Sequence, residues 1–436
     1  MTTAFTPDAA RDLGGPDWLV ERRLLAVERL ADVSWPSASE EIWRYSRIDD
    51  FDLDHYRPVS LAEIGQPGDE RAPGGGPWAA EVGKVAGMLV VRDGRVVHHE
   101  LDTALEAAGV RVCGLATCGR DDEVRRHLGS CTSESEDAFT VLHDAFLPGG
   151  ALVSVPAGVV VADPIVVLHW CEGAGEASFP HTLVVAGDDS EVTVLERTGS
   201  PQTSHLVVAA VELVVGDAAR VAYLSVQQHG SQTWSIATQR ARVGADGSLR
   251  SAAIALGGDY ARLRSESLLA GRGAESNLLA VYFGDGAQML DFRTLQDHAA
   301  PNTQSNLLFK GAVEDRARSV YSGLIRIRED AGKAEAYQTN RNLVLTEGAG
   351  AESIPNLEIL NNDVKCSHAS AVGSIDEDQL YYLESRGVSP EEAERLIVLG
   401  FFDDVLDRLP LQSLTASLRS AIVEKIEHRG ARVSAL

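Results

Sequence analysis

The pattern of hydrophobic and polar positions changes twice along the chain. Near the N-terminus, Val20, Leu24, Val27 and Ala31 recur at the three- and four-residue intervals of a helix with one apolar stripe. From about 141 to 372, short β-branched runs alternate with Gly, Asp, Pro or Asn turns, and no long amphipathic segment interrupts them. Helical spacing returns after 372. The pattern predicts a strand-rich body between two helical regions.

The strand-rich body is predicted to be a solenoid. A long series of strands without crossover helices excludes a doubly wound sheet, and a closed sandwich of this length would be very large. Stacked rungs, each in contact mainly with its neighbours, fit the pattern better. The similar segments 276–280, 305–309 and 340–344 are what stacked rungs would leave in a sequence. We therefore expect a mainly β protein with a parallel β-helix core and helical flanks.

These changes of pattern predict three domains. Residues 1–140 form a mixed, largely helical N-terminal region with a Gly/Pro-rich linker near 67–77, residues 141–372 the β-helix core, and residues 373–436 a helical domain. Within the first region a hairpin is expected around Asp93-Gly94, because this dipeptide suits the positive φ angles of a two-residue turn.

The C-terminal helices have well-marked ends. Asp376 is placed as an N-cap with Gln379 three residues later, and Gly387 is a natural stop. Ser389, followed by Pro390, begins a second helix. A last helix is expected over 414–426.

Composition narrows the class of protein. The chain has 436 residues, 44% of them hydrophobic, and a formal charge of -25. An acidic surface repels nucleic acids and anionic membranes. Five cysteines in so long a chain argue against a disulfide framework. The first residues lack the pattern of a secretory signal, and no apolar run reaches the length of a bilayer span, so we expect a cytoplasmic protein.

Candidate chemistry is limited to metal ligation. The chain lacks the phosphate-binding loop, the dinucleotide fingerprint, the Gly-x-Ser-x-Gly elbow and the His-Glu-x-x-His helix. Cys366 and His368 lie two residues apart, so on a strand both side chains point to one face, and thiolate and imidazole are ligands for iron–sulfur clusters and zinc. A structural cysteine beside a hydrogen-bonding histidine produces the same spacing, so the pair alone leaves both interpretations open.

The remaining thiols and histidines carry weaker signals. Cys113, Cys118 and Cys131 do not have zinc-ribbon spacing and are interpreted as inert or buried thiols, with their role left open. His298 lies at a predicted turn and is interpreted as a hydrogen-bonded corner residue.

The ordered set of motifs resembles the SufB/SufD family of the Suf iron–sulfur cluster assembly system. The resemblance extends over roughly 40–410 and is densest over 291–402. The form Lys-Cys-Ser-His at 365–368 favours the SufD branch, although Ala-Ser-Ala follows where that branch has Gly-Ala-Thr. The resembling segments are 41–45, 298–305, 310–311, 321–323, 355–359, 363–368, 378–383 and 385–387.

The resemblance implies a right-handed parallel β-helix and a non-catalytic subunit of an assembly complex. In that complex the β-helix pairs with a SufB-like subunit, and the C-terminal helices dock the SufC ATPase. A transient iron–sulfur cluster forms at the interface, shared with SufB, with His368 and Cys366 as metal ligands. The resemblance leaves open a flavin in the complex and a homodimer in the absence of partners.

Two alternatives stand beside this interpretation. One is a SufB-like primary scaffold that holds a cluster on its own. The other is a solenoid enzyme that acts on carbohydrate, since many parallel β-helices bind sugars along a lateral groove. Such an enzyme needs a cluster of carboxylates and basic residues on one face, whereas the acidic residues here fall mostly in turns and helices.

Overall fold

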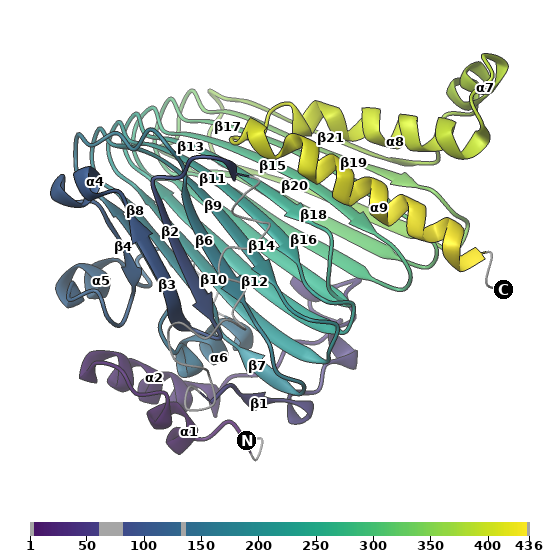
Figure 1. The fold of residues 1–436 in the computed structure, drawn as a ribbon. Helices are drawn as coiled ribbons and strands as arrows, with labels where there is room; N and C mark the ends of the chain where they lie inside the picture. The colour runs from purple at the N-terminus through teal and green to yellow at the C-terminus, as the bar shows by residue number, and fades with distance from the viewer. Residues whose placement is uncertain (1–3, 61–81, 132–136, 434–436) are drawn as a thin grey trace.

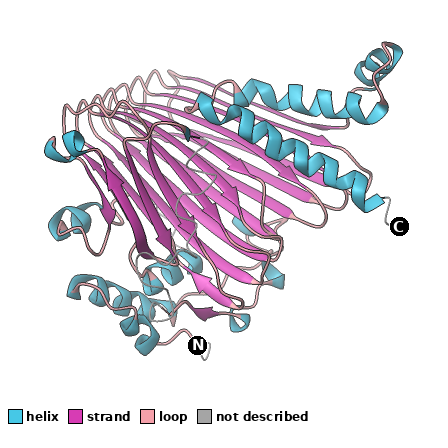
Figure 2. Cartoon of the chain, in the orientation of Figure 1, coloured by secondary structure: helices cyan, strands magenta, loops and turns pink. Residues whose placement is uncertain are grey.

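The body of the protein is a parallel β-helix with helices on two of its outer faces (Figure 1). The computed structural model describes residues 4–60, 82–131 and 137–433, with side chains up to residue 427. The linker expected near 67–77 lies outside these residues. Figure 2 shows the strands stacked in two layers with the helices outside them. The expected mainly β class and parallel solenoid are confirmed.

The strands form two sheets, and consecutive core strands alternate between them. We name them sheet A and sheet B. Sheet A consists, along its main path, of β20 (Gly350–Ile359), β18 (Arg318–Ile327), β16 (Met289–His298), β14 (Tyr260–Leu269), β12 (Thr233–Val243), β10 (His205–Val215), β8 (His181–Ala186), β5 (Ala151–Val155) and β4 (Arg111–Gly114), with the short strands β1 (Arg57–Pro58) and β7 (Glu176–Ser178) beside it. Sheet B consists of β21 (Lys365–Gly373), β19 (Glu335–Val344), β17 (Gln304–Val313), β15 (Glu275–Gly284), β13 (Ser248–Ala255), β11 (Arg220–Gln228), β9 (Glu191–Gly199), β6 (Ile165–Trp170), β2 (Gly87–Arg92) and β3 (Arg95–Leu101).

Similar sequence segments lie directly over one another in sheet B. Residues 276–280 pair in register with residues 305–309, position by position. The third segment is displaced, because Asn340 pairs with Phe309 and not with Ser305. The first two segments therefore lie on neighbouring rungs, as expected. The third segment lies on the next rung, in a shifted register.

The expected hairpin is formed by β2 and β3, which pair antiparallel. Asp93 and Gly94 both have positive φ angles, 46° and 87°. Strand β2 also pairs in parallel with β6, so the hairpin joins the first rungs of sheet B.

Helices of the N-terminal part cover the outer face of sheet A. Phe139 and Phe146 of α6 lie in one buried cluster with Val208 of β10 and Ile236 of β12. The helix expected from Pro16 is present, but its buried face is centred on Leu19 and Ala26, and not on Val20 and Leu24. The elements of this part are α1 (Pro7–Asp12), α2 (Asp17–Leu30), η1 (Glu41–Trp43), η2 (Ile48–Asp50), η3 (Leu53–His55), α4 (Thr103–Ala107), α5 (Asp121–His127) and α6 (Ala138–Phe146).

The C-terminal helices α8 (Pro390–Leu406) and α9 (Thr415–Val433) lie across the outer face of sheet B (Figure 1). Val398 and Phe402 of α8 and Ile422 of α9 share a buried cluster with strand residues such as Phe283 of β15. Buried Lys310 of β17 fastens α8, because its ammonium donates to the Phe401 carbonyl at 2.9 Å and pairs with Asp404 at 3.0 Å. Helix α7 (Glu377–Ser385) and the short η4 (Gln412–Leu414) complete this part.

The predicted start and end of α7 and the predicted start of α8 are confirmed. The Asp376 carboxylate accepts hydrogen bonds from the backbone N–H groups of Asp378 and Gln379. Gly387 follows the end of α7 with φ of 88°, and Ser389 caps α8 with Pro390 in the first turn. The last helix is longer than expected, reaching Val433.

The two ends of the solenoid differ. At the N-terminal end, β3 and β4 add antiparallel strands to the two sheets, and Leu105 of α4 packs against the interior cluster. At the other end, β20 and β21 form the last rung, and within the described part of the chain no strand pairs with their outer edges. We call β20 and β21 the terminal rung.

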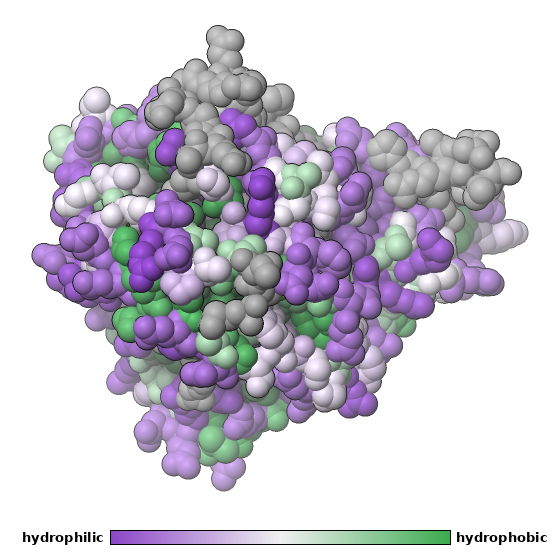
Figure 3. Space-filling model, turned by 90° about the horizontal axis from the view of Figure 1, so that it is seen from below, coloured by the Kyte–Doolittle hydropathy of each residue, from purple (hydrophilic) through white to green (hydrophobic). Residues whose placement is uncertain are grey.

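The surface is polar where the view from below shows it. In Figure 3, hydrophilic residues cover most of the visible face, and hydrophobic residues form small separate patches. Among the helices of the described residues, none is both long enough and apolar enough to cross a membrane.

Candidate functional site

Cys366 and His368 lie on the same face of β21, as the sequence predicted. They pair in register with Ala336 and Gln338 of β19, and both of these partners are buried. Cys366 packs against the interior cluster that contains Ala336. Since in-register positions of parallel strands share a face, Cys366 and His368 face the interior of the β-helix at its last rung.

The interior is open at this rung. Leu357 and Ile359 of β20 pair with Ile325 and Ile327, which are fully buried, yet they are 37% and 43% exposed. Val372 of β21 is likewise 45% exposed. A further rung would cover these side chains. The terminal rung therefore presents Cys366 and His368 among apolar side chains that have no cover.

The pair can supply part of a metal site. Cys366 is half-buried and His368 exposed. Burial raises the pKa of the Cys366 thiol, so without a metal the sulfur stays protonated at neutral pH. Protein-bound iron–sulfur clusters are commonly held by four ligands, and β21 offers two. In the described residues the only group of three or more convergent ligands lies elsewhere.

The segment Ala-Ser-Ala at 369–371, which replaces the expected Gly-Ala-Thr, has a regular strand backbone. These residues continue β21 and pair in register with residues 339–341 of β19. The strand therefore keeps its alternation past His368.

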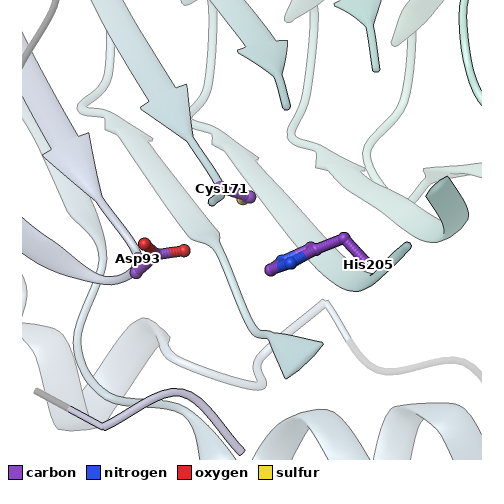
Figure 4. A group of neighbouring side chains, drawn as sticks. All are labelled: Asp93, Cys171 and His205. Carbon is purple, nitrogen blue, oxygen red and sulfur yellow. The ribbon is translucent and has the colours of Figure 1, made fainter. Parts of the chain in front are cut away.

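That other group of convergent ligands comprises Asp93, Cys171 and His205. The ligand atoms of these three buried side chains all lie within 4.8 Å of one another. In Figure 4, Asp93 and His205 point toward each other, with Cys171 beside the space between them. We call these residues the buried triad.

Backbone pairing at one corner of the solenoid builds the triad. Asp93 occupies the β2–β3 turn, and its N–H donates to the carbonyl of Trp170, the last residue of β6. Cys171 follows directly, and its N–H donates to the Gly199 carbonyl. His205 is the first residue of β10.

Ser178 connects the triad. Its hydroxyl donates to the Asp93 carboxylate at 2.6 Å and lies 3.0 Å from His205 Nε2. His205 Nδ1 lies 2.8 Å from the Gly173 carbonyl. Because a carbonyl only accepts, Nδ1 carries the hydrogen and Nε2 is left for the triad. Asp93 also accepts from the Glu172 N–H at 3.1 Å.

Burial controls the acid–base character of these groups. It raises the pKa of Asp93 to about 7, with a further increase from the charge of Glu176, although Ser178 opposes it. It raises the pKa of Cys171 well above the usual value, helped by the negative charge of Asp93. It lowers the pKa of His205, although the Gly173 carbonyl opposes it. At neutral pH the metal-free thiol and imidazole are therefore both uncharged.

The other residues singled out in the sequence are hydrogen-bonded or buried. All five cysteines are free thiols. The contact between Cys113 and Cys118 raises the pKa of Cys113 and lowers the pKa of Cys118 to about 7, and Cys131 is buried. His298 is fully buried between the hydroxyls of Thr303 and Ser305, each 2.8 Å away, which confirms the hydrogen-bonded interpretation.

A groove over sheet A is the natural place for a carbohydrate site, and two of its three lining carboxylates are ion-paired. Among the residues that line it, Glu266 pairs with Arg240 and Arg264, and Asp297 pairs with Arg328 at 2.7 Å. Glycoside hydrolysis needs a free acid and base on either side of the bond. These ion-paired carboxylates do not supply one.

Sequence reasoning missed the buried triad. In the sequence Asp93 stands out only as a turn residue, Cys171 directly follows β6, and His205 begins β10 about one solenoid turn later. Their spacing matches no metal motif; the pairing of β2 with β6 in sheet B and of β10 with β7 in sheet A brings them together at one corner.

Comparisons with known proteins agree with the fold. A family model described as "SUF system FeS cluster assembly, SufBD core domain" matches residues 169–401. The iron–sulfur cluster assembly protein SufD of Bacillus subtilis is 30% identical over 429 residues, which cover 94% of this chain and 95% of the relative. A SufBD family protein of Mycobacterium tuberculosis is 35% identical over 286 residues, 63% of this chain and 71% of the relative. One of Staphylococcus epidermidis is 26% identical over 409 residues, 91% and 87%.

Proposed function

The chain belongs to the SufBD family of iron–sulfur cluster assembly proteins, and we propose that it is a non-catalytic, SufD-type subunit of a cluster assembly complex. In this proposal the terminal rung joins a SufB-like subunit. Cys366 and His368 contribute ligands to iron or to a nascent cluster that the two subunits share. The cluster is cargo that is passed on.

The observation that carries the proposal is the uncovered terminal rung with its partial ligand set. Two unpaired strand edges and exposed apolar side chains favour association with another strand or rung. Cys366 and His368 lie on the same opening, so a partner that covers it also comes next to them. A partner is then well placed to complete the ligand set.

The same observation favours this role over that of a primary scaffold. A SufB-like scaffold that holds a cluster alone needs a full ligand set on one chain. In the described residues β21 supplies two donors, and the triad, which has three, is buried and includes only one thiol. A shared cluster fits this distribution of ligands better.

We assign docking of a SufC-type ATPase to the C-terminal helices, with α7 as the main contact. The apolar face of α8 is largely used on sheet B, where Val398, Phe402 and Val405 are buried. Helix α7 buries no residue, and its Tyr381 and Tyr382 are 73% and 57% exposed. Exposed tyrosines are frequent at protein interfaces. An ATPase subunit would supply the nucleotide hydrolysis for which this chain has no phosphate-binding loop.

The partner assignments are tested by coexpression with a SufB-like chain and a SufC-type ATPase, followed by affinity purification. Leu357→Lys places a charge on the terminal rung and is expected to remove the SufB-like chain while keeping the ATPase. The double variant Tyr381→Ala/Tyr382→Ala is expected to do the reverse. Loss of neither partner from either variant would refute both assignments.

The ligand role is tested by anaerobic reconstitution of the purified complex with iron and sulfide, followed by visible absorption. His368→Ala and Cys366→Ser are expected to keep the complex and to lose most of its cluster absorption. His99→Ala is the matched control, because His99 is also exposed on a strand but lies on β3, at the other end of the solenoid. Wild-type cluster content in both terminal-rung variants would remove the ligand role.

A further inference from the structure

We propose that Asp93, Cys171 and His205 form a second, structural metal site that binds one zinc-class divalent ion inside the β-helix. The site lies on other strands than the terminal rung and does not depend on the proposed function.

The side chains are close to the geometry that such an ion needs. Zinc binds sulfur at about 2.3 Å and imidazole nitrogen or carboxylate oxygen at about 2.0–2.2 Å, so tetrahedral ligands lie roughly 3.3–3.8 Å apart. The ligand atoms of the triad already lie within 4.8 Å of one another. A movement of about 1 Å, small enough for side-chain rotation, would close them on an ion.

The hydrogen bonds around the triad leave a lone pair of His205 for an ion. His205 Nε2 and the Asp93 carboxyl group both face the Ser178 hydroxyl, which has a single hydrogen. That hydrogen is donated to Asp93 at 2.6 Å, and His205 Nδ1 donates to the Gly173 carbonyl, so the lone pair of His205 Nε2 is available as a ligand. A cation between Asp93 and His205 would accept lone pairs from both side chains.

The surroundings of the triad also match a metal site. A metal-bound histidine usually donates its other ring N–H to a carbonyl or carboxylate, as His205 Nδ1 does to the Gly173 carbonyl. The carboxylate of Asp93 is held by the Glu172 N–H and by Ser178. One thiolate, one carboxylate and one neutral imidazole balance a divalent cation, so the loaded site is electrically neutral inside the protein.

Burial points to a structural and not a catalytic metal. All three residues are less than 5% exposed, so a substrate has no direct access. The ion would connect the β2–β3 turn, the end of β6 and the start of β10. It would thereby fasten the N-terminal hairpin to the first rungs.

The test uses the full chain, treated with a chelator and then titrated with Co²⁺ as a spectroscopic probe for zinc. We expect one cobalt per chain, with a thiolate-to-cobalt charge-transfer band. Cys171→Ser is expected to remove the band, and Asp93→Asn, which preserves shape, to weaken Co²⁺ binding by more than about tenfold. Zinc is expected to raise the melting temperature of the wild type and not that of Cys171→Ser.

Matched controls separate this site from the other thiols. The double variants Cys366→Ser/His368→Ala and Cys113→Ser/Cys118→Ser are expected to keep the band. X-ray absorption of the zinc-loaded wild type, which needs no variant to fold, is expected to show one sulfur ligand together with nitrogen and oxygen. Absence of cobalt binding, a zinc shell without sulfur, or a band that survives Cys171→Ser or disappears in either double variant would overturn the proposal.

Discussion

The buried carboxylate of Asp291 offers a sharp test of how the N-terminal segment is held on the β-helix. Asp291 is fully buried on β16 and accepts hydrogen bonds from Arg262 at 2.6 Å, Arg293 at 2.7 Å and Tyr260 at 2.8 Å. The two arginines extend further and donate to backbone carbonyls of the segment 41–45. Asp291→Asn preserves the shape but removes the charge on which both arginines depend.

The expected loss of stability follows from the burial of the network. Removing one member of a buried ion pair costs about 3–5 kcal/mol, because the remaining charge is left without compensation. With an m-value of about 3 kcal/mol per M or more for so long a chain, the urea midpoint should fall by roughly 1–1.5 M. Asp403→Asn is the control: it breaks the partly exposed pair with Arg419 and should cost at most about 1 kcal/mol.

The dependence on pH has a definite sign. Burial alone would raise the pKa of Asp291, but Arg262 and Arg293 outweigh it and hold the pKa below its usual value. A carboxylate with a lowered pKa in the folded state stabilises the protein above its unfolded pKa, and this contribution is lost as pH falls. The difference between wild type and Asp291→Asn should therefore stay constant from pH 8 to 5 and shrink only below about pH 4.

Tryptophan fluorescence gives a local readout of the same change. The Arg262 guanidinium lies 3.7 Å from the centre of the Trp43 ring, and Trp43 is buried. A loosened segment should shift the emission to longer wavelength, and the shift should disappear in a Trp43→Phe background. A stability loss below about 1 kcal/mol, equal to that of Asp403→Asn, would refute the reasoning.

Three further predictions concern the packing of the β-helix. Gly311→Ala would place a methyl group against the ring of Tyr282 and should cost about 1–3 kcal/mol in urea denaturation; an unchanged midpoint would contradict this. Lys310→Met removes the contacts that fasten α8 to β17, so amide exchange should accelerate in α8 but not in the strands; equal rates in α8 would contradict it. Burial raises the pKa of Glu196 to about 7, so the contribution of this group to stability is lost as pH rises from about 4.5 to 7. Glu196→Gln should flatten this part of the melting-temperature profile, and a profile parallel to the wild type would be inconsistent with that cause.

Local features of the fold could be predicted from the sequence because their interactions are local. The caps at Asp376 and Ser389 act on N–H groups within three residues. The Asp93-Gly94 turn depends only on its own φ angles. The solenoid was recognised from the regular recurrence of strands and turns. Helix α6 was not predicted, because its hydrophobic residues are buried on nearly every side and show no clear apolar stripe.

The candidate sites were only partly predictable. The alternation of a strand placed Cys366 and His368 on one face, but a strand pattern does not say whether that face is covered by another rung. The triad could not be found, because the register of distant strands decides which side chains meet. The buried face of α2 was displaced for a related reason: sheet A and α6 decide which side of a helix is covered.

The difference between the two ends of the solenoid has a consequence for how the chain folds during synthesis. Each strand pairs with one made about thirty residues earlier, as Leu307 does with Leu278, so a rung leaving the ribosome meets a neighbour that is already formed. The covered end with β3 and β4 emerges first. Among the described strands, β20 and β21 with their free edges emerge last, and the helices α7, α8, η4 and α9 follow them. A growing chain therefore pairs each earlier strand edge before the free edges of β20 and β21 appear, which limits misassociation during synthesis.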